Sequence, residues 1–108
     1  MSDSAITNDK RWRWLMKMGD EAILLSPEQS RAARGWLDWT QQHLADRASV
    51  SLSTVRDFEK RRRRPTAQSL AAMRQVFAEA GISLSFDADG RPSGINVTAR
   101  ALDGARLQ

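Results

Sequence analysis

Hydrophobic and polar positions between residues 26 and 81 recur at the spacing of short amphipathic helices. The first helix has the clearest start, because Ser26 is followed by Pro27 at the first helical position and by Gln29 at the third. This is the capping-box arrangement, in which side chains satisfy backbone N–H groups that the helix leaves unpaired. The pattern predicts a helix that runs from this cap to about Leu37.

Three more helices are predicted at short intervals. Thr40 predicts the N-cap of a helix over residues 41–48, and Ser51 predicts the N-cap of another over residues 52–60. Thr66, directly after a proline, predicts the N-cap of a longer fourth helix. That helix carries an apolar stripe formed by Leu70, Met73, Phe77 and Ala80.

After the fourth helix the period of the pattern changes to two. Ile82, Leu84 and Phe86 alternate with polar residues, as in a half-buried strand. The sequence DADGRPSG then predicts a turn, and Ile95 and Val97 predict a second, shorter strand. Two strands alone are marginally stable, so this hairpin must pack on the helices or on another subunit.

These patterns divide the chain into four segments. Residues 1–25 form an N-terminal extension, a Trp/Arg-rich arm that we expect to be partly disordered and otherwise helical or extended against the domain. Its RWRW sequence suits packing or a dimer contact, a DNA-touching arm or a membrane surface, and the acidic pair nearby weakens the last. Residues 26–81 form the helical domain, residues 82–98 the hairpin, a candidate dimerisation element, and residues 99–108 a tail without assignable structure.

Composition adds a local concentration of positive charge. The chain has 17 Lys and Arg against 13 Asp and Glu, a formal net charge of +4. Four consecutive cations account for this excess: Arg61, Arg62, Arg63 and Arg64. Concentrated positive charge favours a polyanionic partner more than a high isoelectric point does by itself.

The same sequence speaks against several other kinds of site. The absence of cysteine excludes disulfides, thiolate zinc sites and cysteine nucleophiles. His43, the only histidine, has no nucleophile or carboxylate pair arranged with it, so we expect a surface role or a role near phosphate, and no catalysis. We therefore expect no enzyme, no metal and no cofactor. No apolar run approaches membrane-spanning length, and we expect a cytoplasmic protein without a membrane partner.

The second and third predicted helices are separated by a turn of three residues, 49–51. Ala45 supplies the small side chain that two closely crossing helices need, and Val50 is an apolar plug beneath the third helix. Leu44, Val55 and Phe58 face the core, which leaves Leu52, Ser53, Arg56 and Asp57 on the exposed side of that helix. An exposed helix of this kind can enter a DNA major groove, with its first residues at the base edges.

This part of the sequence resembles the Cro/repressor-type helix-turn-helix regulators, also called xenobiotic-response-element-like (XRE). The matching text runs from SPEQ to AEAGI, more than half of the chain. Within it, W-T-Q-x-x-L-A and V-S-x-S-T-V-R-D-F-E resemble the second and third helices of the family, and P-T-x-x-x-L resembles the start of its fourth. The resemblance implies a mainly α fold, a lambda-repressor-like domain of about five helices, here with a short C-terminal β-hairpin.

The resemblance also implies roles for single residues. Thr40 and Gln41 match positions that hold DNA phosphates at the amino end of the second helix. Base readout is implied for the opening and the groove-facing side of the third helix, at Ser51, Leu52, Ser53, Thr54, Arg56 and Asp57. The connector after this helix would lie along the DNA backbone, so the remaining candidate phosphate contacts are Arg61, Arg62, Arg63 and Arg64, of which one or two are expected to point away.

Some positions leave alternatives open. The family often has glycine where this chain has Ser49 and Arg61, and a left-handed backbone would cost either residue on the order of 1 kcal/mol. We therefore expect the turn or the helix end to differ slightly. Leu52 would either touch a thymine methyl or fold back on the protein. Asp57 would either accept from a cytosine amino group or orient Arg56.

Four further side chains are expected to be structural. Trp36 and Trp39 are assigned to core and inter-helix packing. Glu59 and Lys60 are assigned to helix-end or surface interactions.

The sequence therefore predicts a regulator that binds double-stranded DNA sequence-specifically, as a repressor or autorepressor. We expect a homodimer on a palindromic operator, because one recognition helix reads few base pairs. One alternative is the DNA-binding antitoxin of a toxin–antitoxin pair, whose protein partner is a toxin or another regulator. The other alternative is an RNA-binding protein that uses the arginine run. The resemblance implies a cytoplasmic, nucleoid-associated protein of a bacterium, a phage or a mobile element.

Overall fold

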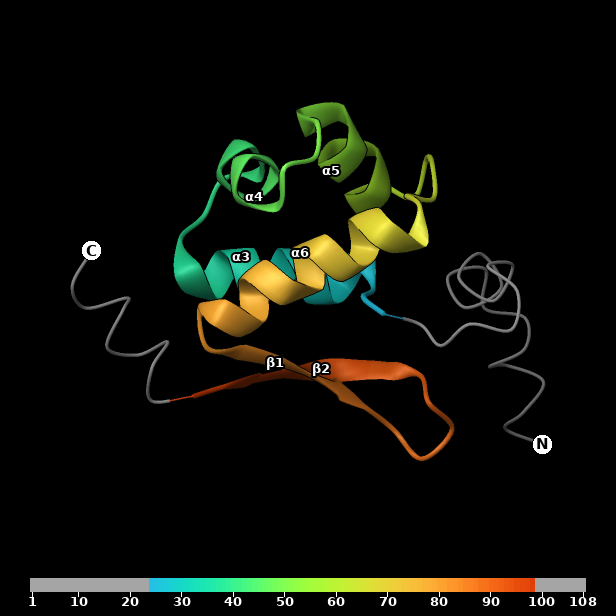
Figure 1. Cartoon of the computed structure of the whole chain (residues 1–108). Helices are drawn as coiled ribbons and strands as arrows, with labels where there is room; N and C mark the ends of the chain where they lie inside the picture. Colours follow the sequence, from blue (N-terminus) through green and yellow to red (C-terminus); the bar gives the residue numbers. More distant parts are fainter. Residues whose placement is uncertain (1–23, 99–108) are drawn as a thin grey trace.

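Four helices and a β-hairpin make up residues 24–98, the part of the chain that this computed structural model describes (Figure 1). In chain order the elements are α3 (Pro27–Leu37), α4 (Gln41–Ala48), α5 (Leu52–Glu59), α6 (Ala67–Glu79), β1 (Ile82–Phe86) and β2 (Pro92–Val97). The predicted mainly α class with a C-terminal hairpin is confirmed. The expectations for the arm before residue 24 and for the tail 99–108 lie outside the described residues.

The elements form three layers, with the pair α4 and α5 on one side of α3 and α6 and the hairpin on the other (Figure 1). α3 packs against α5 and against β2, and α6 packs against α4 and against β1. The hairpin therefore lies far from the surface that α4 and α5 form.

Each described helix begins at the N-cap that the sequence predicts. The side chains of Ser26, Thr40, Ser51 and Thr66 each accept a hydrogen bond of 3.0 to 3.1 Å from the backbone N–H three residues further on. Such a cap typically stabilises a helix by about 1 kcal/mol, because it pairs an N–H that has no acceptor within the helix. Gly81, which follows α6 with a φ of 93°, allows the chain to turn into β1.

A single apolar core joins the helices to the hairpin. Its fully buried members include Leu44, Val55, Phe58, Leu70, Met73 and Phe77, all of which the sequence assigns to the core. Trp39 is also buried, and its ring stacks on Phe77 at 5.8 Å between centroids. Trp36 is 48 % exposed, so its predicted place in the core is wrong. It projects from the margin of the buried face of α3, which the helix forms with Ala33 and Leu37.

The apolar side of the hairpin faces the chain's own helices. β1 and β2 are antiparallel, and Leu84, Ile95 and Val97 are partly buried against the core. Ser83 and Asn96 are exposed on the other side of the pair. The predicted alternation is confirmed, and its apolar positions find their partner within the chain.

The turn of the hairpin is shorter than the sequence predicts. β2 begins at Pro92 and not at Ile95, because Phe86 pairs with Pro92 across a register shift that follows Ser85. The carboxylate of Asp87 accepts two backbone N–H groups of the turn, both at 2.9 Å. These bonds close the turn locally, as aspartate side chains often do.

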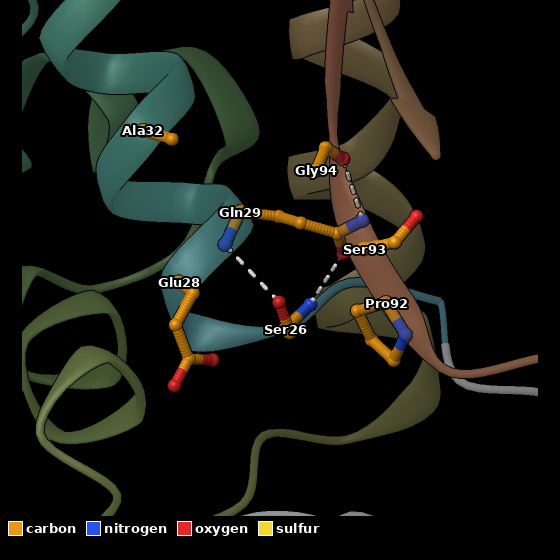
Figure 2. Close-up of a pocket in the computed structure, with 7 residues that line it drawn as sticks. All are labelled: Ser26, Glu28, Gln29, Ala32, Pro92, Ser93 and Gly94. Carbon is orange, nitrogen blue, oxygen red and sulfur yellow. Dashed lines mark hydrogen bonds between the residues drawn. The ribbon is translucent and has the colours of Figure 1, made fainter. Parts of the chain in front are cut away.

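Gln29 connects α3 to the hairpin. Its Oε1 accepts from the backbone N–H of Ser26 at 3.0 Å, which completes the capping box. Its Nε2 donates to the carbonyl oxygens of Ser85 at 2.9 Å and Gly94 at 3.0 Å, two residues that pair across the hairpin. Figure 2 shows this side chain reaching from α3 to β2. One buried amide therefore starts the helix and holds the hairpin beneath it.

Replacing Gln29 with glutamate tests this double role. The variant keeps an acceptor for Ser26, but a carboxylate oxygen would face the carbonyl oxygens of Ser85 and Gly94 in place of a donor. We expect the free energy of unfolding, measured by urea denaturation, to fall by about 2–3 kcal/mol. The control is Gln68→Glu in the exposed first turn of α6, which we expect to be neutral or slightly stabilising. An equal loss in both variants would contradict the role of Gln29.

Candidate nucleic-acid interface

The turn between α4 and α5 has three residues, as predicted, and its geometry is held at both ends. Ser49 ends α4 with a left-handed backbone, and the N–H of Val50 donates to the carbonyl of Ala45 at 3.0 Å. Ala45 is fully buried and Val50 packs on the core, so the predicted small contact residue and apolar plug are confirmed. Ser51 then caps α5 and sets its direction.

Ser49 and Arg61 keep the left-handed backbone that glycine would adopt easily. Their φ angles are 58° and 59°. The expected deviation of the turn or the helix end is therefore wrong at both positions. Both residues take the left-handed conformation despite their side chains, and each site carries strain on the order of 1 kcal/mol.

α5 presents one side to the core and the other to the outside. Val55 and Phe58 are fully buried. Among the candidate base-reading residues, Ser51, Ser53 and Arg56 are exposed, and Leu52, Thr54 and Asp57 are half-buried. Leu52 is half-buried and is not one of the partly buried side chains that pack on the core cluster.

Three hydroxyl groups lie together at the amino end of α5. The Oγ of Ser51 accepts from the N–H of Thr54 at 3.1 Å, and it lies 2.8 Å from Thr54 Oγ1 and 3.0 Å from Ser53 Oγ. A hydroxyl can donate one hydrogen bond and accept two. The cluster can therefore present a donor or an acceptor to a base edge by rotating its hydroxyl hydrogens.

The connector between α5 and α6 folds back onto the end of α5. The backbone N–H of Arg62 donates to the carbonyl oxygen of Asp57 at 2.8 Å. A cleft of about 170 Å³ opens beside it and is lined by Thr54, Asp57, Arg63, Arg64, Pro65, Thr66 and Ser69. The structure thus brings two candidate base-reading residues next to two candidate phosphate-binding arginines. Asp57 lies beside Arg63 and Arg64 in this cleft.

The four consecutive arginines are not equivalent. Arg62, Arg63 and Arg64 are exposed. Arg61 is half-buried, and its guanidinium forms an ion pair with Glu28 of α3. Three of the four guanidinium groups are therefore presented to solvent, and the fourth binds the connector to α3.

Thr40 and Gln41 stand at the amino end of α4. Thr40 is exposed, and its hydroxyl accepts from the N–H of His43 at 3.0 Å. Gln41 is half-buried, and its Nε2 donates to Glu59 Oε1 at 3.1 Å. An amide nitrogen carries two hydrogens, so Gln41 keeps a second donor for an anion at the end of the helix.

Glu59 was assigned to helix-end or surface interactions; it is the last residue of α5, but it is buried at 3 % exposure, so the surface alternative is wrong. It follows Val55 by one helical turn and therefore shares the core-facing side of α5. Its carboxylate accepts hydrogen bonds from Arg34 Nε at 2.9 Å and Nη2 at 2.7 Å, from Ser30 Oγ at 2.6 Å and from Gln41 Nε2 at 3.1 Å. One carboxylate thus joins α3, α4 and α5.

The helical spacing of the sequence indicates that the polar residues of this cluster lie on the buried sides of their helices. Ser30 and Arg34 are one turn apart on α3, as Val55 and Glu59 are on α5. The spacing places each polar residue on a buried face, but it does not show that the two faces meet.

The pKa of Glu59 lies below its ordinary value of 4.5. Burial by itself would raise this pKa, because it disfavours the charged form. Hydrogen bonds from Arg34, Ser30 and Gln41, with the charge of Arg34, outweigh that effect. The folded chain therefore holds Glu59 as a carboxylate.

His43 takes part in a stack on the outer side of α4. Its ring lies parallel to Trp39 with centroids 4.9 Å apart, and its Nε2 accepts from Arg47 Nε at 2.7 Å. The guanidinium of Arg47 also lies over the Trp39 ring at 4.8 Å. This histidine packs against its neighbours and stands near Thr40.

Two other features are absent from residues 24–98. No helix there is long and apolar enough to cross a membrane. The same residues contain no group of three or more metal-ligating side chains of the His, Cys, Asp and Glu types.

Replacing Glu59 with glutamine should destabilise the fold by about 3 kcal/mol, because it leaves the charge of Arg34 without its partner. The pKa of Glu59 is lower in the folded chain than in the unfolded chain, so its stabilisation is complete above about pH 4.5 and is lost as the pH falls through the folded-state pKa. Urea denaturation of the wild type at several pH values should show this loss, and the variant should lack this contribution. Glu79→Gln, on the exposed end of α6, is the control and should change stability by less than about 0.5 kcal/mol.

Replacing Ser49 with glycine should stabilise the fold by up to about 1 kcal/mol, because glycine adopts a φ of 58° without steric cost. The larger entropy of glycine in the unfolded chain offsets part of this gain. The same change at Ser53, inside α5, should lower stability by about 0.5–1 kcal/mol. The change in stability of each variant is measured by thermal unfolding. If both changes have the same sign, the strain at Ser49 is contradicted.

A sequence model of the helix-turn-helix family matches residues 31–84, which is half of the chain. The match covers most of α3, all of α4, α5 and α6, and the start of β1. No curated protein matches the chain significantly. The matched segment includes the capped α4, the three-residue turn and the exposed side of α5. The chain belongs to the XRE-type helix-turn-helix family of DNA-binding transcriptional regulators.

Proposed function

We propose that this protein is a transcriptional repressor that binds a palindromic operator as a homodimer. The observation that carries the proposal is the surface formed by the exposed side of α5 and the connector after it. Arg56 on the helix and Arg62, Arg63 and Arg64 on the connector are all exposed. α5 and this connector lie on the side of the molecule away from the hairpin (Figure 1). Such a surface suits a major groove bordered by phosphates.

In this proposal the two sets of residues do different work. Ser51, Leu52, Ser53, Thr54, Arg56 and Asp57 discriminate between bases, because they occupy the start and the outer side of α5. Thr40, Gln41 and the arginines of the connector set the register on the phosphates. Arg61 contributes less than its three neighbours, because its guanidinium already pairs with Glu28.

The dimer is proposed because one recognition helix contacts few base pairs, and two-fold symmetry doubles the site. The hairpin is the candidate dimerisation element. Its apolar side packs on the chain's own helices, so the argument for a second subunit rests on the outer edges of its two strands, which no strand of residues 24–98 pairs. A dimer formed at the hairpin would leave α4 and α5 of both copies free for DNA (Figure 1). Repression then follows from occupation of a promoter, and the proposal includes no catalytic step.

The division of labour can be measured by binding to the DNA upstream of the protein's own gene at several salt concentrations. Arg62→Ala and Arg63→Ala should each weaken binding to all sequences and lower the slope of log K against log salt by about 1. Ser53→Ala and Arg56→Ala should change which sequence is preferred, with about 1–3 kcal/mol of discrimination at the affected position.

Arg74→Ala is the matched control, because Arg74 is exposed on α6 and lies over Phe86 of the hairpin at 5.8 Å. Its removal should leave both the affinity and the salt slope unchanged. The assignment of roles fails if the connector variants alter sequence preference and the α5 variants do not. Tight binding to structured RNA that survives loss of Ser53 and Thr54 would favour the RNA-binding alternative.

A further inference from the structure

Asp57 is the only acidic residue among those proposed to contact DNA. The others carry hydroxyl, amide, aliphatic or guanidinium side chains. Asp57 is half-buried in the last turn of α5, and it lines the cleft of about 170 Å³ together with Arg63 and Arg64. Its negative charge therefore lies beside two groups that are proposed to bind phosphate, which is itself an anion.

The backbone of the connector keeps these charges together. The N–H groups of Arg62 and Arg63 both donate to the carbonyl oxygen of Asp57, at 2.8 and 3.4 Å. The connector thus folds back over the last turn of α5. The cleft is small enough for the charges that line it to lie within a Debye length, which is about 8 Å at physiological ionic strength. Salt therefore leaves a large part of their interaction unscreened.

The carboxylate of Asp57 acts across the cleft without direct pairing. No ion pair among residues 24–98 includes Asp57, and no side-chain hydrogen bond there joins it to Arg56. Arg63 and Arg64 are exposed, so a phosphate can reach both of them. The carboxylate lowers the positive potential that attracts the phosphate, because the two anions repel each other at short range.

This repulsion bears on the choice between DNA sequences. Non-specific binding depends almost entirely on phosphate contacts, so a carboxylate beside those contacts weakens it on DNA of every sequence. A base amino group in the major groove can offset the cost, since aspartate accepts a hydrogen bond from N4 of cytosine. A protein gains specificity when an unpaired charge disfavours the wrong partner as well as when a contact favours the right one.

We propose that Asp57 determines specificity by lowering the affinity of Arg63 and Arg64 for phosphate. This inference rests on the proposed function, because it assumes that the connector contacts the DNA backbone. On an operator that places a cytosine amino group beside α5, the carboxylate accepts a hydrogen bond and the cost is offset. On other DNA the carboxylate meets phosphate and base acceptors without a donor, and the complex is weaker.

The test compares the affinity of the full chain for two duplexes of equal length at about 0.1 M salt, where the Debye length is about 10 Å. One duplex carries the sequence that the wild type selects from a random pool, and the other has a random sequence. Asp57→Asn removes the charge and keeps a side-chain oxygen. We expect the affinity for the random duplex to rise about two- to fivefold, the range for two unit charges 8 to 4 Å apart in water. The affinity for the selected duplex should not rise, so the ratio of the two affinities should fall by at least about twofold.

Two further variants separate this role from other effects of charge and structure. Asp89→Asn removes the same charge from the exposed hairpin turn, on the side away from α5 (Figure 1), and should leave both affinities unchanged. In an Arg63→Ala/Arg64→Ala background, Asp57→Asn should no longer raise the affinity for the random duplex, because its effect passes through these arginines. Partial unfolding would weaken binding, so a gain in affinity cannot come from a loss of structure.

Three results would overturn the inference. An equal gain on both duplexes would show that Asp57 has no part in specificity. A gain that persists without Arg63 and Arg64 would show that these arginines do not transmit the effect. If Asp57→Asn gives no gain while Arg63→Ala still weakens binding, the inference fails and the proposed phosphate contacts stand. If Arg62→Ala and Arg63→Ala leave binding unchanged, the proposed function fails as well.

Discussion

The hydrogen bonds to the buried carboxylate of Glu59 are the interaction on which the arrangement of α3, α4 and α5 depends. Glu59 ends the recognition helix α5 and accepts hydrogen bonds from Ser30 and Arg34 on α3 and from Gln41 at the start of α4. A buried anion is costly unless its oxygen atoms are paired, so a shift of any of these three helices would leave charge or donors unpaired. The side of α5 that we propose to read bases and the end of α4 that we propose to face phosphates are therefore held in one arrangement by one group.

α3 connects α5 to the hairpin on the other side of the molecule. Through Arg34 it binds α5, and through Gln29 it binds the hairpin at the carbonyls of Ser85 and Gly94. A single helix thus links the surface proposed for DNA to the hairpin proposed for dimerisation. If two copies associate through their hairpins, the separation of their recognition helices is set by packed side chains and not by a linker.

Most of the fold could be predicted from short sequence patterns, because each of these patterns depends on residues that are neighbours in the chain. The four N-caps, the three-residue turn and the alternation of the hairpin are each carried by neighbours in sequence, and each is confirmed. The surface alternative for Glu59 and the core position of Trp36 were wrong, because burial depends on the element that packs opposite. The left-handed backbone at Ser49 was also missed, since the packing of α4 against α5 requires this turn even though the residue disfavours it.

By itself the sequence determined where helices begin, which side of each is apolar and where positive charge is concentrated. These properties follow from helical periodicity, capping and composition, and they were enough to identify a family and to propose a set of contact residues. Only the tertiary structure decided which polar groups share the interior, because Ser30, Arg34 and Glu59 meet across 29 residues of chain. It also decided that Arg61 turns to Glu28 while its three neighbours stay in solvent. Pairing of this kind depends on distance in space, which no local pattern records.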